Sequence, residues 1–198
     1  MKKRRSAALN EQTAYHPTVW RTCRALANLN RLRCLRIVLE QPAVTVGEIA
    51  ERLSLSVCYA SQVLRALQAR GLLAARRESR WVRDVAHPDP LVVGSSLLLT
   101  ALNRALLKEC RSDASLIRTL TAFTHVRRLE ILRLLQVRSP LGAEDIQAHT
   151  RISSPALSRH LKKLSQRGMV SCADDRWSLL PPCDTLAATL LKLLATGT

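Results

Sequence analysis

Basic, hydroxyl and imidazole side chains gather on one side of the segment SSPALSRHLKKLSQRGMV, residues 153–170. Leu157, Leu161 and Leu164 have the spacing of a helix with one buried stripe. The polar side chains lie outside that stripe, and their groups suit hydrogen bonds to base edges and phosphates. The segment therefore predicts a helix that enters the major groove of DNA, with these candidate contacts: Ser153, Ser154, Ser158, Arg159, His160, Lys162 and Lys163.

A related segment, SVCYASQVLRALQARGLL, occupies residues 56–73. The two align without a gap at a constant offset of 97 residues, from Trp20–Gly71 onto Ile117–Gly168. An ungapped match of this length predicts two copies of one domain. The aligned candidates in the first copy carry less charge, and they are Ser56, Tyr59, Ser61, Gln62 and Arg65.

Each copy continues past a glycine into an apolar pair, a polar tip and a tryptophan, which predicts a two-stranded hairpin. The first hairpin carries Arg76, Arg77 and Arg80, whereas the second carries Asp174 and Asp175 before Arg176. Arginine favours the phosphate backbone and aspartate repels it. We therefore expect the first copy to bind DNA mainly through its hairpin and the second mainly through its helix. Trp81 and Trp177 are expected to anchor the hairpin bases by packing.

Three helices followed by a hairpin form the winged helix-turn-helix plan, so the fold is predicted to be mainly α with small β-hairpin wings. The expected organisation is a basic, disordered arm at 1–16, a first winged-helix domain with a long closing helix at 17–112, and a second at 113–198. The closing helices, within 91–110 and 183–196, are too apolar to face water alone. They are expected to pack on each other and on the opening helices.

The 198-residue chain has a net charge of +16 and a pI of about 10.9, which favours a polyanionic partner. No signal peptide is visible at the start, and Gly94, Ser95, Ser96, Asn103 and Arg104 interrupt its most apolar run. We therefore expect a soluble cytoplasmic, nucleoid-associated protein with double-stranded DNA as its partner and no membrane contact.

The 6 cysteines form neither a CxxC motif nor a Cys/His pair at metal-ligand spacing, so no metal or other cofactor is expected. Cys23 and Cys34 align with Leu120 and Ile131 and are interpreted as buried apolar residues. Cys58 lies in the first turn of a predicted helix, where the dipole favours a reactive thiolate, so it is a possible redox site. No phosphate-binding loop or nucleophile–base set is present, and the chain is not predicted to be an enzyme.

The motifs RRLEILRLL, SSPALSRHLKKLSQRGMV and the Arg-Trp hairpin resemble the arsenic-repressor (ArsR) family of winged-helix regulators, as do LANLNRLRCLRIVL and VLRALQARGLLAARRESRWV. The resemblance covers most of residues 17–196. It implies pairing through first and last helices, so one chain can supply both halves as an intramolecular pseudo-dimer. Several family members sense metals through cysteines on the helix that here is VGEIAERL or AEDIQAHT. Neither copy has a cysteine there.

Together these patterns predict a sequence-specific regulator of transcription that binds double-stranded DNA, most simply a repressor. Two alternatives remain open at this point: a DNA-organising protein without sequence preference, and a winged-helix module for protein interaction. The sequence also leaves open whether the chain acts as a monomeric pseudo-dimer or forms a homodimer.

Overall fold

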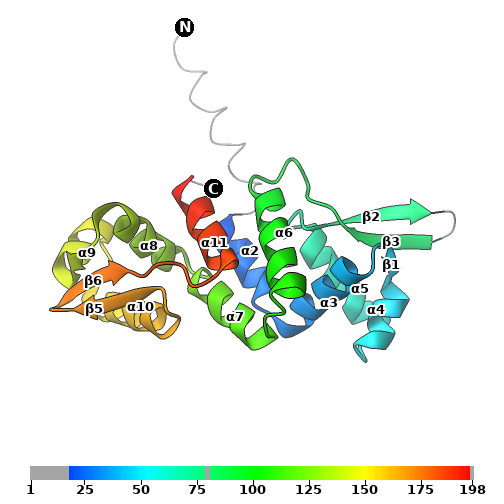
Figure 1. Ribbon diagram of the computed structural model, residues 1–198, viewed down its shortest axis with the longest axis horizontal. Helices are drawn as coiled ribbons and strands as arrows, with labels where there is room; N and C mark the ends of the chain where they lie inside the picture. Colours follow the sequence, from blue (N-terminus) through cyan, green and yellow to red (C-terminus); the bar gives the residue numbers. More distant parts are fainter. Residues whose placement is uncertain (1–17, 79–80, 197–198) are drawn as a thin grey trace, which may run out of the picture.

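Two domains of one plan make up the computed structural model, which describes residues 18–78 and 81–196 (Figure 1). The first domain contains α2 (Val19–Leu26), α3 (Leu29–Glu40), β1 (Val44–Thr45), α4 (Val46–Arg52), α5 (Val57–Gln68), β2 (Leu73–Glu78), β3 (Trp81–Ala86), α6 (Ser95–Asn103) and a π-helical turn, η1 (Arg104–Lys108). The second contains α7 (Asp113–Ala122), α8 (Val126–Arg138), β4 (Leu141–Gly142), α9 (Ala143–Thr150), α10 (Ser154–Gln166), β5 (Val170–Ala173), β6 (Arg176–Leu179) and α11 (Thr185–Ala195).

The two helix-turn-helix units, α4–α5 and α9–α10, have similar backbone φ angles at aligned residues. Ser54 and Arg151 align in the repeat, and both adopt left-handed conformations in the turn, with φ of 54° and 52°. Gly71 and Gly168 also align and end α5 and α10 with φ of 65° and 69°, a region that glycine adopts without steric cost. The internal repeat predicted from the sequence is therefore a repeat of structure.

Each domain has a three-stranded antiparallel sheet, in the orders β1-β3-β2 and β4-β6-β5. The wing of the first domain has strands of 6 residues and that of the second has strands of 4. Asp174 and Asp175 form the two-residue turn of the second wing with φ of 49° and 57°, as a type I′ turn requires. Both predicted hairpins are confirmed.

Buried apolar stripes hold α5 and α10 on their domains. These are the two helices that the sequence predicts to contact DNA, and they are called the reading helices below. Leu157, Leu161 and Leu164 on α10 are at most 2% exposed, and Leu64 and Leu67 on α5 are buried in the same way. These leucines belong to one apolar core that extends through both domains. The helical spacing seen in the sequence therefore identified the buried face correctly.

Cys23 and Cys34 are fully buried in this core, as expected. Burial raises the pKa of the Cys23 thiol far above its usual range. Burial, with a smaller contribution from the charge of Asp84, raises the pKa of Cys34 to about 11. Both thiols are therefore held in the protonated, unreactive form at neutral pH.

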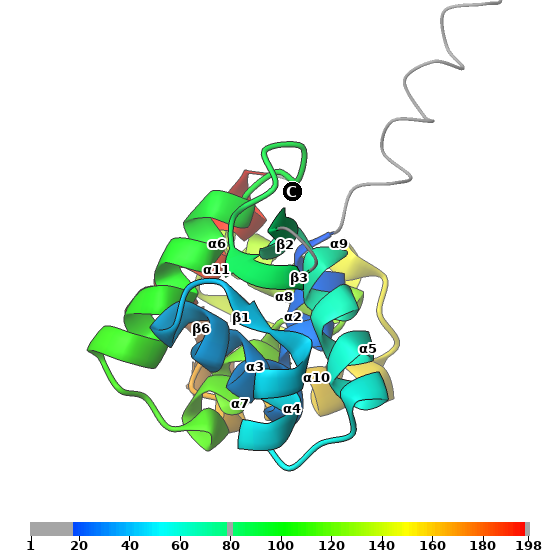
Figure 2. The same cartoon turned by 90° about the vertical axis from the view of Figure 1, so that its right-hand side faces the viewer.

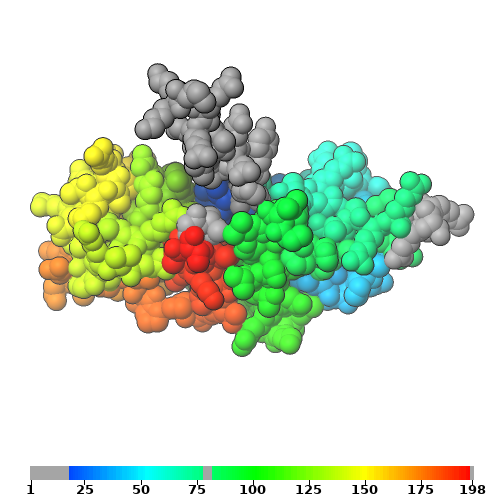
Figure 3. Space-filling view, turned by 90° about the horizontal axis from the view of Figure 1, so that it is seen from above, coloured from blue at the N-terminus to red at the C-terminus, as the bar shows by residue number. Residues whose placement is uncertain are grey.

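The two domains meet through equivalent elements, because α2 packs against α7 and α6 packs against α11. Figure 3 shows α11 and α6 side by side, red against green. This confirms the expectation that the closing helices pack on each other, and α11 also contacts α2. First helix thus packs against first helix and last against last within one chain, which is the pairing that the family resemblance implies.

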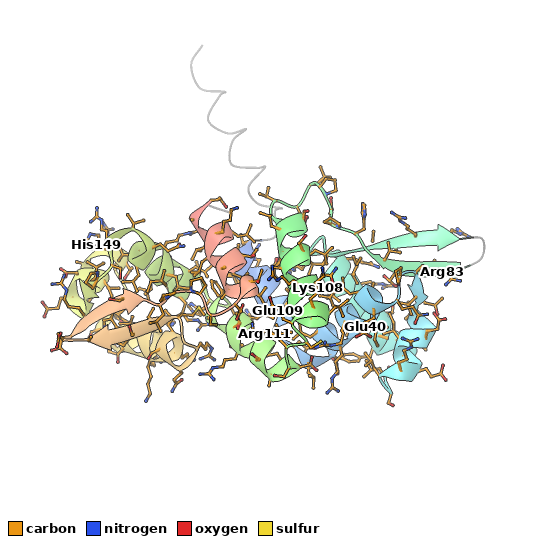
Figure 4. All side chains as sticks on the ribbon, viewed as in Figure 1. Glu40, Arg83, Lys108, Glu109, Arg111 and His149 are labelled. Atoms are coloured by element: carbon orange, nitrogen blue, oxygen red, sulfur yellow. The ribbon has the colours of Figure 1, made fainter. Side chains whose placement is uncertain are left out.

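Polar contacts reinforce the junction. The Arg36 guanidinium on α3 binds Asp113 at the start of α7 at 3.0 Å and also donates to the Leu106 carbonyl of η1. Arg111 forms an ion pair with Asp184, and the Thr185 hydroxyl donates to Glu109 Oε1 at 2.9 Å. Figure 4 shows Glu109 and Arg111 near the centre of the molecule, where α6, α7 and α11 converge.

The closing helix of the first domain is shorter than the sequence suggested. We expected one long helix across residues 91–110, but α6 begins at Ser95 and changes to π-helical geometry at Arg104. Gly94 precedes it with φ of 82°, a conformation that a helix does not continue through. A Cβ at Gly94 would lie 2.6 Å from Leu193 Cδ2, so the glycine also permits the close approach of α11.

Candidate nucleic-acid interface

The two reading helices lie on the same side of the molecule. In Figure 2, α5 and α10 are toward the right-hand side of the view, and the closing helices α6 and α11 are toward the left. The packing that joins the domains therefore leaves both reading helices on a side away from the closing helices. The shared core fixes their relative position.

The polar face of α10 is open to solvent. Ser153 lies at the N-cap position, where its side chain makes no capping hydrogen bond, and Ser154 is the first residue of the helix. Arg159 extends along the helix, and its Nε donates to the Pro155 carbonyl at 3.3 Å. The exposed members of the predicted set are Ser153, Ser154, Ser158, Arg159, Lys162 and Lys163.

His160, the remaining predicted contact on α10, is placed differently. It is half-buried, and its ring centroid lies 4.7 Å from that of His125 at the start of α8. Its Nδ1 is buried and has no hydrogen-bond partner among the described residues. Burial, followed by the charges of His125 and Arg128, lowers the pKa of His160, so the ring is neutral at pH 7. His160 thus lies beside the core stripe, at the position that Val63 occupies in α5.

Two predicted contacts on α5 also serve the local fold. The Ser56 Oγ accepts from the Tyr59 backbone N–H at 3.2 Å and so caps the helix. The Tyr59 hydroxyl accepts from Asn30 Nδ2 at 3.4 Å, which links α5 to α3. Gln62 and Arg65 are exposed, whereas Ser61 is half-buried.

The wings differ in charge as the sequence predicted. Arg76 and Arg77 are exposed on β2, and Arg80 lies outside the described residues. On the second wing the Arg176 Nη2 donates to the Pro140 carbonyl at 3.1 Å, next to the exposed Asp174 and Asp175. The backbone of Trp81 pairs in the sheet, its side chain lies outside the described part, and Trp177 packs partly buried against the core. The arm at 1–16 lies outside the described residues as well.

Sequence reasoning missed two cations at this surface. Arg83 on β3, labelled in Figure 4, is directly opposite Arg76 on β2 in the sheet register, so the first wing carries a cross-strand pair of arginines. Arg151 is exposed in the turn just before α10, and its alignment with the turn residue Ser54 was the available signal. Sequence reasoning also missed a polar contact: Gln68 at the end of α5 forms a hydrogen bond with the buried Asp84 of β3. The hydrophobic pattern of the sequence does not reveal such a bond.

No group of three or more His, Cys, Asp or Glu side chains is placed to hold a metal ion within residues 18–78 and 81–196. Across the same described ranges, no helix is both long and apolar enough to cross a membrane. Cys58 is exposed in the first turn of α5, with Gln62 Nε2 at 3.9 Å from its Sγ. Its redox role stays a prediction.

Comparison with known families agrees with this geometry. Residues 125–171, from the start of α8 into β5, match the model of the family described as bacterial regulatory protein, arsR family. Residues 27–79, from just before α3 to the end of β2, match the model of the MarR family. The search of curated proteins found no match. The chain therefore carries two winged helix-turn-helix regulatory domains in tandem, and it is a DNA-binding transcriptional regulator.

Proposed function

We propose that one chain binds a specific double-stranded DNA site as an intramolecular pseudo-dimer and represses transcription by occupying a promoter. The observation that supports this most directly is the display of α5 and α10 on one side of a molecule whose domains share a core. Two winged-helix units held in this way resemble the two halves of a dimeric repressor. The chain acts in the cytoplasm at the nucleoid.

The operator is expected to be an imperfect palindrome, because the two reading surfaces differ. Half-sites are expected about one helical turn apart, roughly 34 Å along the DNA. Of the two lysines on α10, Lys162 aligns with the cationic Arg65 of α5, whereas Lys163 aligns with the uncharged Ala66. The half-site under the second domain is therefore read mainly by a helix, and the half-site under the first domain is bound largely through the wing arginines.

Side chains that read bases favour a specific regulator over a general DNA-organising protein. Gln62 can pair with adenine, and Arg159 and Lys162 can pair with guanine, each through atoms in the major groove. The net charge of +16 does not distinguish a specific regulator from a general DNA-organising protein, because phosphate contacts carry no sequence information. Specificity therefore rests on the polar face of the reading helices.

The test is fluorescence-anisotropy titration of the full chain with DNA from upstream of its own gene and with a scrambled duplex of equal length. A sequence-specific regulator prefers the upstream DNA by about a thousandfold or more at fixed salt. Equal, steeply salt-dependent affinities identify a general DNA binder instead. Absence of binding even at low salt indicates a protein-interaction module.

A footprint on the bound duplex tests the single-chain arrangement. One chain per site, measured by mass photometry of the complex, together with unequal protection of two half-sites, agrees with the pseudo-dimer. Two chains per site, or equal protection of identical half-sites, contradicts it.

A further inference from the structure

An open groove in the first domain is lined by four arginines and a tryptophan. It lies between α2, the start of α3 and the C-terminal end of α5, and it encloses about 410 Å³. Its lining residues are Trp20, Arg21, Arg24, Ala25, Arg31, Ala66, Ala69 and Arg70. A volume of this size suits a small metabolite. No acidic side chain is among the lining residues.

The arginines of this groove have few partners. Arg31 Nη1 donates to the Ala25 carbonyl at 3.0 Å, but the Nε atoms of Arg31 and Arg70 are both buried with no acceptor among the described residues. The Arg21 guanidinium carbon lies 5.2 Å from the centroid of the Trp20 ring. No ion pair to a carboxylate is formed by Arg21, Arg24, Arg31 or Arg70 within the described ranges.

Buried donors without acceptors and cations without counterions are both costly. Burial, followed by repulsion from Arg21 and Arg31, lowers the pKa of Arg70. The groove therefore holds positive charges that repel one another and that an anion would stabilise.

The equivalent position of the second domain differs, because the arginines there are bonded to acceptors of the same domain. Three of the arginines recur there as Arg118, Arg128 and Arg167. Arg118 Nη2 donates to the Gln166 carbonyl at 2.6 Å, and Arg167 Nε donates to the Thr121 hydroxyl at 2.8 Å. Every one of these guanidinium groups has an acceptor within the domain.

Two substitutions between the repeats account for the difference. Thr121, which accepts from Arg167, is replaced by Arg24 in the first domain, so an acceptor becomes a fourth cation. Thr124, whose hydroxyl accepts from Arg128 at 2.6 Å, is replaced by Ala27. The first domain has thus lost two acceptors and gained one charge at an otherwise equivalent position.

We propose that this groove, defined by Trp20, Arg21, Arg24, Arg31 and Arg70, binds a small multivalent anion that carries phosphate or carboxylate groups. Guanidinium groups bind such anions through paired, charge-assisted hydrogen bonds. Four of them match a ligand with two or more negative charges. Trp20 supplies an apolar wall for the body of the ligand.

Occupancy of the groove is expected to affect DNA binding, a consequence that rests on the proposed function. Ala66 lies on the reading helix α5, and Ala69 and Arg70 follow directly at its end. A ligand that draws α2 and the end of α5 together therefore acts on the element that meets the major groove. By linkage, DNA and the anion then change each other's affinity by the same factor.

Calorimetric titration of the full chain with inorganic pyrophosphate and with citrate, without DNA and at constant ionic strength, tests the site itself. Arg24→Thr, which introduces the residue of the second domain, is expected to weaken binding at least about tenfold, since one charge-assisted contact to the anion is lost. Arg118→Gln is the matched control, because it removes the same charge from the equivalent position of the second domain. It is expected to leave binding unchanged.

Binding of one equivalent that Arg24→Thr weakens and Arg118→Gln does not supports the proposal. Absence of binding by both probes overturns it. Equal weakening by both variants also overturns it and indicates that only net charge is sensed. If Arg24→Thr weakens DNA binding while neither probe binds, the groove holds a DNA phosphate and the proposal is also wrong. Since the titration contains no DNA, its result is independent of whether the operator hypothesis holds.

Discussion

Gln68 Nε2 donates a hydrogen bond to Asp84 Oδ1 at 2.7 Å, and this bond joins the end of the reading helix α5 to the wing strand β3. Asp84 is 1% exposed. Burial raises the pKa of its carboxyl group, and the bond from Gln68 partly offsets that effect. Gln68 thus supplies a hydrogen bond to the buried carboxyl group of Asp84 and links the helix to the wing strand.

Replacement of Gln68 by leucine is expected to lower the free energy of unfolding by about 1 to 3 kcal/mol, because it leaves a buried acceptor without its donor. Urea denaturation at pH 7 measures this change. Gln62→Leu, on the exposed face of the same helix, serves as the control and should cost much less. Equal costs for the two variants would show that the buried bond contributes nothing to stability.

The ring pair of His125 and His160 makes the stability of the second domain depend on pH. The pKa of each histidine is lowered, first by burial and then by neighbouring positive charges, with Arg128 and Lys163 acting on both rings. The unfolded chain therefore takes up protons at a higher pH than the folded one, and stability is lost as pH falls below about 6.5 through the folded pKa values.

His160→Val, which introduces the residue of the first domain, is expected to reduce this loss. The measurement is the thermal unfolding midpoint between pH 7.5 and pH 5. His87→Gln, at an exposed position, is the control and should follow the wild-type pH profile. A His160→Val profile as steep as that of the wild type would rule out the ring pair as the source.

The sequence predicted the secondary structure well where the repeat supplied two independent copies of a pattern. The leucine stripes of α5 and α10, the helix-ending Gly71 and Gly168, and both hairpins were visible because periodicity and glycine positions are local signals. The boundary of α6 was less clear. Its apolar run extends on both sides, and only the left-handed Gly94 and its contact with α11 set the start.

The candidate interface was predicted in outline but not in each side chain. His160 fits the polar pattern of α10, yet its position beside His125 depends on how α8 packs, which spacing does not encode. The bond between Gln68 and Asp84 joins an end of a helix to a strand, so no periodic pattern reveals it. The basic groove around Arg70 depends on which acceptors each guanidinium group meets in three dimensions, as the bond from Arg167 to Thr121 shows in the second domain.

Gly94 controls the packing of the two closing helices. Its φ of 82° is strained for any other residue, and an added Cβ would approach Leu193 Cδ2 to 2.6 Å. Gly94→Ala is therefore expected to destabilise the chain by about 1 to 3 kcal/mol, from backbone strain and overpacking together.

Thermal unfolding checks this cost, and Gly47→Ala is the control. A Cβ at Gly47 meets only Thr45 Oγ1, at 4.0 Å, so that variant should be neutral or stabilising within α4. If Gly94→Ala were as stable as Gly47→Ala, the close contact of α6 with α11 would not be needed to hold the domains together.

The two domains are expected to respond differently when their charges are removed. Loss of Lys162 and Lys163 on α10 should reduce both affinity for the operator and the preference over scrambled DNA, because a reading helix contacts bases as well as phosphates. Loss of Arg76 and Arg77 on the first wing should weaken binding to both duplexes alike. Each phosphate contact that is removed lowers the slope of log affinity against log salt by about 0.9.

Anisotropy titrations across salt with the two double-alanine variants measure these slopes. A double variant of Lys108 and Lys192, both exposed on the closing elements, removes the same charge from the opposite side and is the control. It should retain the wild-type slope, because phosphates near the reading helices lie far from it. Should the control lose as much slope as the other two variants, net charge rather than the reading surface would govern binding, and the division between helix and wing would be wrong.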